Sequence, residues 1–154
     1  MDETKKINAL MVLEIIGRPP ELLTETLEEL IKKIGGEKGV VVRDKKINEP
    51  IIMKDQEEFY TTFAEVEVEV EGILHLAILM FKYMPAHIEV LSPEHITLSN
   101  NGWDDILNEL TRRLHGYDEI ARVFQLQIAQ LQKRIKELSG EQGIQTPKAS
   151  EPEE

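Results

Sequence analysis

The C-terminal third of the chain carries a continuous pattern of apolar side chains. From Leu107 to Leu138 an apolar or aromatic residue recurs at alternating steps of three and four, without a single exception. This spacing is a heptad repeat with Leu107 at an a position, and it predicts one long helix with an apolar seam about 50 Å long. The seam consists of Leu107, Leu110, Leu114, Tyr117, Ala121, Phe124, Ile128, Leu131, Ile135 and Leu138.

A seam of that length needs a partner, because one small domain can hardly cover it. Ile106 and Ile120, at g positions, widen the stripe in the first half, which suits packing against a globular surface. In the second half, Ile at a and Leu at d favour a parallel two-stranded coiled coil, in which Arg113 meets Asp118 of the partner. We expect a homodimer or a different coiled-coil protein as partner; the alternative is a helix folded back on its own domain.

The first 99 residues alternate between strand and helix patterns. The clearest strand has Ala64, Val66, Val68 and Val70 on one face and Glu65, Glu67, Glu69 and Glu71 on the other. The order of predicted elements is β-α-β-β-α-β, which is typical of a ferredoxin-like α+β domain with an antiparallel sheet. The expected elements are a strand over Ala9–Ile16, a helix from Pro19-Pro20 to Gly35-Gly36, a strand over Val40–Ile47, a loop over Pro50–Glu58, the Ala64–Glu71 strand, a helix over Ile73–Met84, a strand over Ala86–Leu91 and a short extended piece over Ile96–Leu98.

We therefore expect three parts in the chain. Residues 1–99 form the ferredoxin-like domain, residues 100–138 form the long C-terminal helix, and residues 139–154 form a disordered acidic tail. Asn101 is the expected N-cap of the long helix.

The predicted helix Ile73–Met84 is apolar around almost its whole circumference, since only His75 and Lys82 are strongly polar. One face can cover the sheet, but the other must be buried as well. Two covers are possible, residues 103–114 of the same chain or another subunit. In the second case the contact is made by Ile73, Leu76, Met80 and Met84.

Composition narrows the classes of partner. The formal net charge of −11 over 154 residues argues against nucleic acid and against anionic membranes, because binding to phosphates depends on Lys and Arg. The chain has no cysteine, which excludes disulfides and thiolate chemistry. No run approaches the roughly 20 apolar residues of a membrane span, and the N-terminus lacks the apolar run of a signal peptide. We expect a cytoplasmic protein.

Candidate chemistry is sparse. The Glu65–Glu71 carboxylates could gather a hard cation, but on one strand they lie nearly 7 Å apart, so a solvated sheet face paired with Arg43 and Lys45 is the better interpretation. His87, His95 and His115 show no ligand spacing and no pairing with a nucleophile. We predict no catalytic residue, no metal site and no cofactor. An enzyme that uses Glu65–Glu71 with His87 is the weakest hypothesis.

One segment resembles a known family. A strand followed by Gly17, Arg18, Pro19, Pro20, Glu21, Leu22 and Leu23 looks like the opening of an ACT domain, a small βαββαβ regulatory module. In that family the turn helps to bind an amino acid across a dimer interface, although Pro20 stands here where glycine is usual. The resemblance implies a possible ligand turn made of Gly17, Arg18, Pro19, Pro20, Leu22 and Leu23.

Two functions follow from these patterns. The first is a non-enzymatic interaction or assembly module that oligomerises through the long helix and the apolar helix 73–84. The alternative, implied by the resemblance, is an ACT-like domain that senses a small molecule such as an amino acid.

Overall fold

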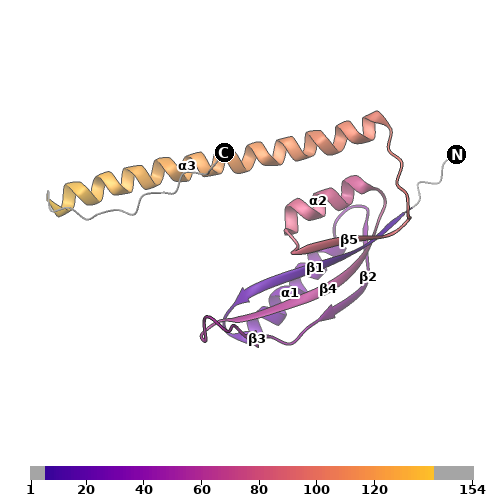
Figure 1. Ribbon diagram of the computed structural model, residues 1–154, viewed down its shortest axis with the longest axis horizontal. Helices are drawn as coiled ribbons and strands as arrows, with labels where there is room; N and C mark the ends of the chain where they lie inside the picture. The colour runs from indigo at the N-terminus through magenta and orange to yellow at the C-terminus, as the bar shows by residue number, and fades with distance from the viewer. Residues whose placement is uncertain (1–5, 141–154) are drawn as a thin grey trace. The chain divides into compact units, whose positions relative to one another are not determined.

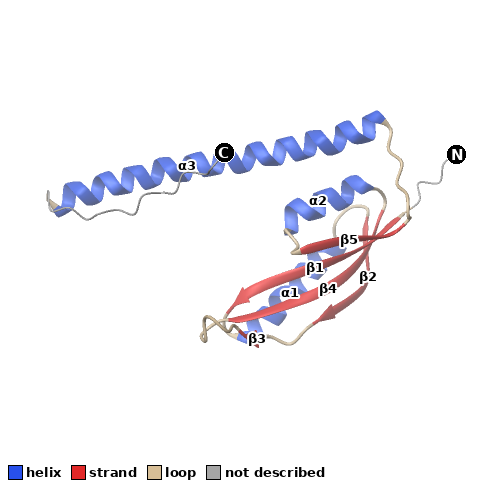
Figure 2. Ribbon diagram, viewed as in Figure 1, coloured by secondary structure: helices blue, strands red, loops and turns tan. Residues whose placement is uncertain are grey.

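A computed structural model describes residues 6–140 of the chain. The chain forms an α+β structure with an antiparallel sheet, two short helices and one long C-terminal helix (Figure 1 and Figure 2). The elements are β1 (Ile7–Gly17), α1 (Pro20–Gly35), β2 (Val40–Ile47), β3 (Ile51–Ile52), β4 (Tyr60–Val70), α2 (Ile73–Tyr83), β5 (His87–Ser92) and α3 (Asn100–Ser139).

The sheet has the strand order β2-β4-β1-β5, and the two-residue β3 pairs with the start of β4. All paired strands are antiparallel. β1 and β4 form the centre and pair along their whole length, from Ile7 opposite Val70 to Gly17 opposite Tyr60. The antiparallel α+β class expected from the sequence is thus confirmed.

Valines and glutamates alternate along β4, and this alternation determines which face of the sheet the helices cover. Val66, Val68 and Val70 are fully buried, whereas the glutamates between them lie on the opposite, open face. The buried valines belong to one core together with side chains of both α1 and α2, so the two helices cover the same face. The helical contributions to this core are Leu27, Ile31 and Ile34 from α1 and Leu76 and Leu79 from α2.

The edge strand β2 contains a bulge that the sequence did not indicate. Its register with β4 shifts between Val42 and Asp44, which makes Arg43 the extra residue. Arg43 then reaches Glu69, with Nη2 2.9 Å from Oε2, as expected. The expected pairing of Lys45 with the glutamates is wrong, because the bulge places Lys45 opposite Val66.

Three further expectations change. The predicted loop Pro50–Glu58 contains the short strand β3, and the expected extended piece Ile96–Leu98 has no regular structure. The long helix begins one residue before Asn101. Ser99, not Asn101, caps it, since the Gly102 N–H donates to Ser99 Oγ at 3.2 Å.

The chain divides into two compact units, a sheet unit that ends at Leu110 and a helix unit that begins at Thr111. The division therefore falls inside α3. The predicted disordered tail, residues 139–154, lies outside the described residues except for Ser139 and Gly140. Within residues 6–140, none of the helices has both the length and the apolar character that a bilayer span requires.

Candidate functional site

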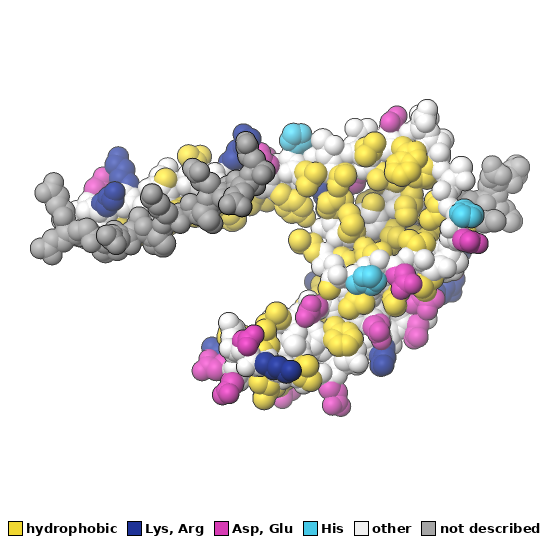
Figure 3. Space-filling model, in the orientation of Figure 1, with side chains coloured by type: hydrophobic (Ala, Val, Ile, Leu, Met, Phe, Trp, Pro, Cys, Tyr) yellow, Lys and Arg dark blue, Asp and Glu magenta, His cyan; other side chains and the backbone are white. Residues whose placement is uncertain are grey.

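The strongest candidate for a functional surface is the apolar seam of α3. The helix is continuous over 40 residues, and none of its residues is buried. The large seam side chains keep roughly half of their surface exposed or more, from 43% at Tyr117 to 80% at Leu138. Figure 3 shows hydrophobic side chains at the surface of this helix. The members with exposed fractions of this kind are Leu107, Leu114, Tyr117, Phe124, Ile128, Leu131, Ile135 and Leu138.

Gly116 does not interrupt the seam. It lies at a c position, and α3 runs through it without a break. A Cβ built on Gly116 meets no atom within 4 Å, so no close approach requires glycine there. The seam on either side of Gly116 therefore belongs to one uninterrupted helix.

The helix carries a second exposed apolar set that the heptad analysis missed. Val123 and Leu126, at c and f positions, are 46% and 66% exposed. The segment from Val123 to Gln132 contains no charged residue. Scanning the same helix for charge, and not only for seam spacing, could have found this stretch.

The apolar helix α2 offers less surface than its sequence indicated. Leu76 is buried in the core and is not available to a partner, and Ile73 packs partly against that core. Met80 and Met84 are the exposed large apolar residues at its C-terminal end, with exposed fractions of 40% and 73%. The expected second contact is thus reduced to these two methionines.

A polar cluster fixes the end of α2 to the loop between α1 and β2. The Tyr83 hydroxyl donates to Glu37 Oε1 at 2.6 Å, and Lys82 forms an ion pair with the same oxygen. Hydrogen bonds from Lys82 and Tyr83 hold the pKa of the Glu37 carboxyl below its usual range. Burial, together with Glu37, raises the pKa of Tyr83 to about 12. This cluster has a structural role, because it ties two elements of the sheet unit together.

The possible ligand turn lies at the end of β1 and the start of α1. Pro19 is the N-cap of α1 and Pro20 its first residue, so neither contributes an N–H to a ligand. Arg18 is already occupied, with Nη1 2.9 Å from Glu58 Oε2 and the guanidinium 5.3 Å from the centre of the Phe59 ring. The remaining members of the turn divide between core and surface, since Leu23 is buried against Gly17 and Leu22 is half exposed.

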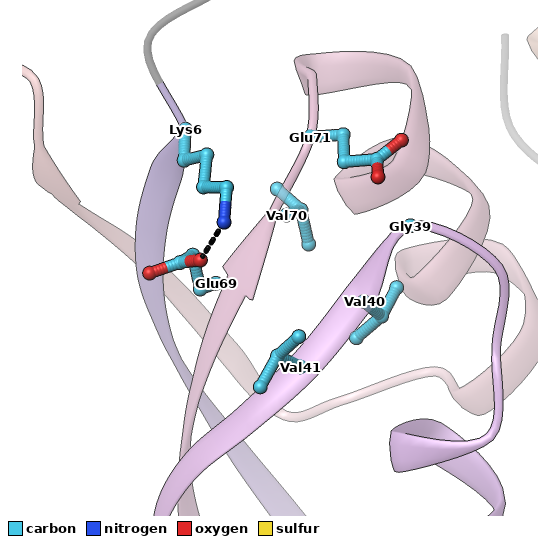
Figure 4. Close-up of a pocket in the computed structure, with 7 residues that line it drawn as sticks. All are labelled: Lys6, Gly39, Val40, Val41, Glu69, Val70 and Glu71. Atoms are coloured by element: carbon cyan, nitrogen blue, oxygen red, sulfur yellow. Dashed lines mark ion pairs between the residues drawn. The ribbon is translucent and has the colours of Figure 1, made fainter.

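Three depressions on the sheet unit have volumes between about 150 and 230 Å³. The one of about 150 Å³ lies where β2 begins and β4 ends (Figure 4). Lys6 and Glu69 face each other in it at 2.9 Å, and Glu71 points away from that pair. The ion pairs with Lys6 and Arg43 lower the pKa of Glu69. Ligand pockets are usually about 300–1,000 Å³, so this depression does not favour a small-molecule site.

Metal-binding side chains do not converge in the described part of the chain. No three His, Asp or Glu side chains between residues 6 and 140 are placed so as to hold an ion. His75 lies on α2 against Gly39, and its Nδ1 has no hydrogen-bond partner among the described atoms. The other histidines, His87, His95 and His115, are exposed.

Both the sheet unit and the long helix match one protein-family model, over residues 8–143. The chain belongs to the MJ0538 family. The match takes in every described element, apart from the first residue of β1, so the MJ0538 family pattern includes the exposed seam as well as the sheet. No curated protein and no solved structure matches the chain.

Proposed function

We propose that this chain is a non-enzymatic assembly module that associates with a second copy of itself through α3. The observation that carries the proposal is a continuous 40-residue helix without a buried residue, whose heptad seam is apolar throughout. A helix with such a seam is typical of coiled coils, and large exposed apolar surfaces mark interaction sites.

The energetics favour association. Fully burying a large apolar side chain contributes about 1.5–3 kcal/mol, so covering the exposed half of each contributes about 1 kcal/mol. Eight large seam residues on each of two helices together contribute about as much as the upper end of an association cost of about 4–15 kcal/mol. Burial of the seam therefore favours the association of two copies.

The experiment measures solution mass by light scattering on the full chain and on the variant Ile128→Asp/Leu131→Asp. We expect the full chain to be a dimer and the variant a monomer, because two carboxylates in the seam cannot be buried without partners. A monomeric full chain at millimolar concentration would overturn the proposal.

A matched control adds the same charge to a different face of α3. Ala129→Asp/Gln130→Asp adds two carboxylates in the same turn at b and c positions, outside the seam. We expect this control to remain a dimer. If both variants dissociate equally, charge and not the seam governs association.

We propose a smaller, second contact at the exposed end of α2. Met80 and Met84 are its exposed large apolar residues, and Met84 follows the last turn in a left-handed conformation with φ 46°. Met84→Lys should weaken the dimer less than the seam variant does. An unchanged dissociation constant would remove α2 from the interface.

A second candidate function is an ACT-like domain that senses an amino acid, within a ferredoxin-like fold. The strand order supports it: counting the four long strands along the chain, they lie in the order second, third, first, fourth. Two β-α-β halves joined in this way form an interleaved antiparallel sheet. Thermal shifts across a panel of amino acids test the candidate, since a ligand at one hundred times its Kd adds about 2.7 kcal/mol. A flat panel would count against sensing.

A further inference from the structure

From the order of side-chain sizes along the seam, we infer that the two α3 helices pair antiparallel, with Leu114 of one copy level with Leu138 of the other. This inference rests on the proposed self-association and names its geometry. It differs from the parallel orientation that Ile at a and Leu at d favour in general. The inference concerns the pairing of the two helix units, each of which begins at Thr111.

Reversing one helix places each a residue against a d residue of the partner. In the register that sets Leu114 against Leu138, every layer combines two seam residues of complementary size. The small Ala121 faces Leu131, and the two aromatic residues face isoleucines. The four layers, each occurring twice by symmetry, are Leu114–Leu138, Tyr117–Ile135, Ala121–Leu131 and Phe124–Ile128.

The parallel arrangement packs the same residues less evenly. Each seam residue then faces its own copy, so an Ala121 pair lies between a Tyr117 pair and a Phe124 pair. The bulky aromatic layers hold the two helices apart on either side of Ala121. The small Ala121 side chains of the two copies can touch only when the helices are close together. The resulting void forfeits packing contacts, whereas large residues opposite small ones fill the space evenly.

Charged residues beside the seam give the parallel arrangement little additional support. The cross-helix pair that parallel packing offers, Arg113 with Asp118, competes with an existing contact, since Asp118 Oδ2 already lies 2.9 Å from Arg122 Nη2.

The absence of cysteine allows a direct distance measurement on the full chain. Spin labels are attached in separate variants at Lys136→Cys and Gln125→Cys, both outside the a and d positions, and label separations are measured by pulsed electron paramagnetic resonance. Antiparallel pairing separates the two Lys136 positions by about 30 Å along the helix axis, at 1.5 Å per residue, and leaves the two Gln125 positions nearly level.

The outcomes separate the two proposals. A long Lys136 separation with a short Gln125 separation supports the antiparallel register. Short separations at both positions would overturn the orientation while leaving self-association standing, and long separations at both would overturn the register. No dipolar coupling at either position would overturn self-association itself.

Discussion

Helices α1 and α3 both present an apolar stripe, but they use it differently. In α1 the stripe is buried at Leu23, Leu27, Ile31 and Ile34, against the sheet of the same unit. In α3, which is more than twice as long, no residue is buried. The difference lies in what stands opposite each helix. Helix α1 faces strands of its own chain, whereas the seam of α3 extends into a unit whose described residues, 111–140, form no strand.

The comparison shows that an amphipathic pattern predicts burial but not the partner that provides it. For α1 the stabilisation by burial is intramolecular and independent of protein concentration. For the seam of α3, under the proposed self-association, it depends on protein concentration. Substitutions in the two helices should accordingly differ in kind as well as in size.

The largest effect is expected in the core of the sheet unit. Leu27→Ala removes a fully buried side chain and should lower the free energy of unfolding by about 2–5 kcal/mol. Two measurements report the loss, a urea titration and the hydrogen exchange of the β4 amides. The comparison with α3 is sharpened by Leu131→Ala, which should leave β4 protection unchanged and weaken only the proposed dimer. Equal losses in β4 would show that the two units unfold together.

Gly39→Ala should produce the next largest loss. Gly39 has φ +73°, and an added Cβ would lie 2.5 Å from His75 Nε2, so both backbone and side chain oppose the substitution. We expect a destabilisation of about 1–3 kcal/mol in the same urea titration. The double variant Gly39→Ala/His75→Ala separates the causes, since relief of the contact restores only the steric part. A neutral single variant would contradict the strained turn.

The cluster around Glu37 should make stability depend on pH. Because the folded-state pKa of Glu37 lies below the ordinary value of 4.5, its contribution is present above that pH and is lost as the pH falls through the folded-state value. Glu37→Gln should cost about 1 kcal/mol near neutral pH. The difference from the unsubstituted chain should shrink below about pH 4.5. A difference that stays constant down to pH 3 would contradict the pairing with Lys82 and Tyr83.

The smallest effect has the opposite sign and lies in α3. Gly116→Ala should stabilise the helix by about 0.5–1 kcal/mol, because alanine has the higher helix propensity and the added methyl meets nothing. Circular dichroism at 222 nm during thermal unfolding measures the shift. The same Gly→Ala change therefore destabilises the sheet unit at Gly39 and stabilises the helix unit at Gly116. A loss at Gly116 would indicate that a partner packs closely there.

Most of the fold could be predicted from local patterns. The valine and glutamate alternation of β4, the leucine periodicity of α1 and the heptads of α3 each carry their own signal. The bulge at Arg43 and the two-residue strand β3 could not be predicted, because they depend on how β2 and β3 align with β4. Those alignments are long-range contacts without a local sequence signal.

The candidate surface could be predicted on α3 but only in part on α2. The spacing of apolar residues alone predicts the seam of α3. On α2 the sequence is apolar on every side, so nothing in it distinguishes Leu76, which faces the core, from Met80, which does not. The rotation of that helix is set by the sheet beneath it, and therefore by tertiary contacts.

The bulged edge strand β2 has a consequence for how far assembly can proceed. A free strand edge can recruit further strands without limit, and charges and bulges prevent this. β2 carries Arg43, Asp44, Lys45 and Lys46 beside its bulge. A helix pair related by a two-fold axis, in contrast, buries both of its seams when it forms and leaves none for a third chain. When α3 pairs and the β2 edge accepts no further strand, assembly through these two surfaces ends at a dimer and does not continue into a fibre.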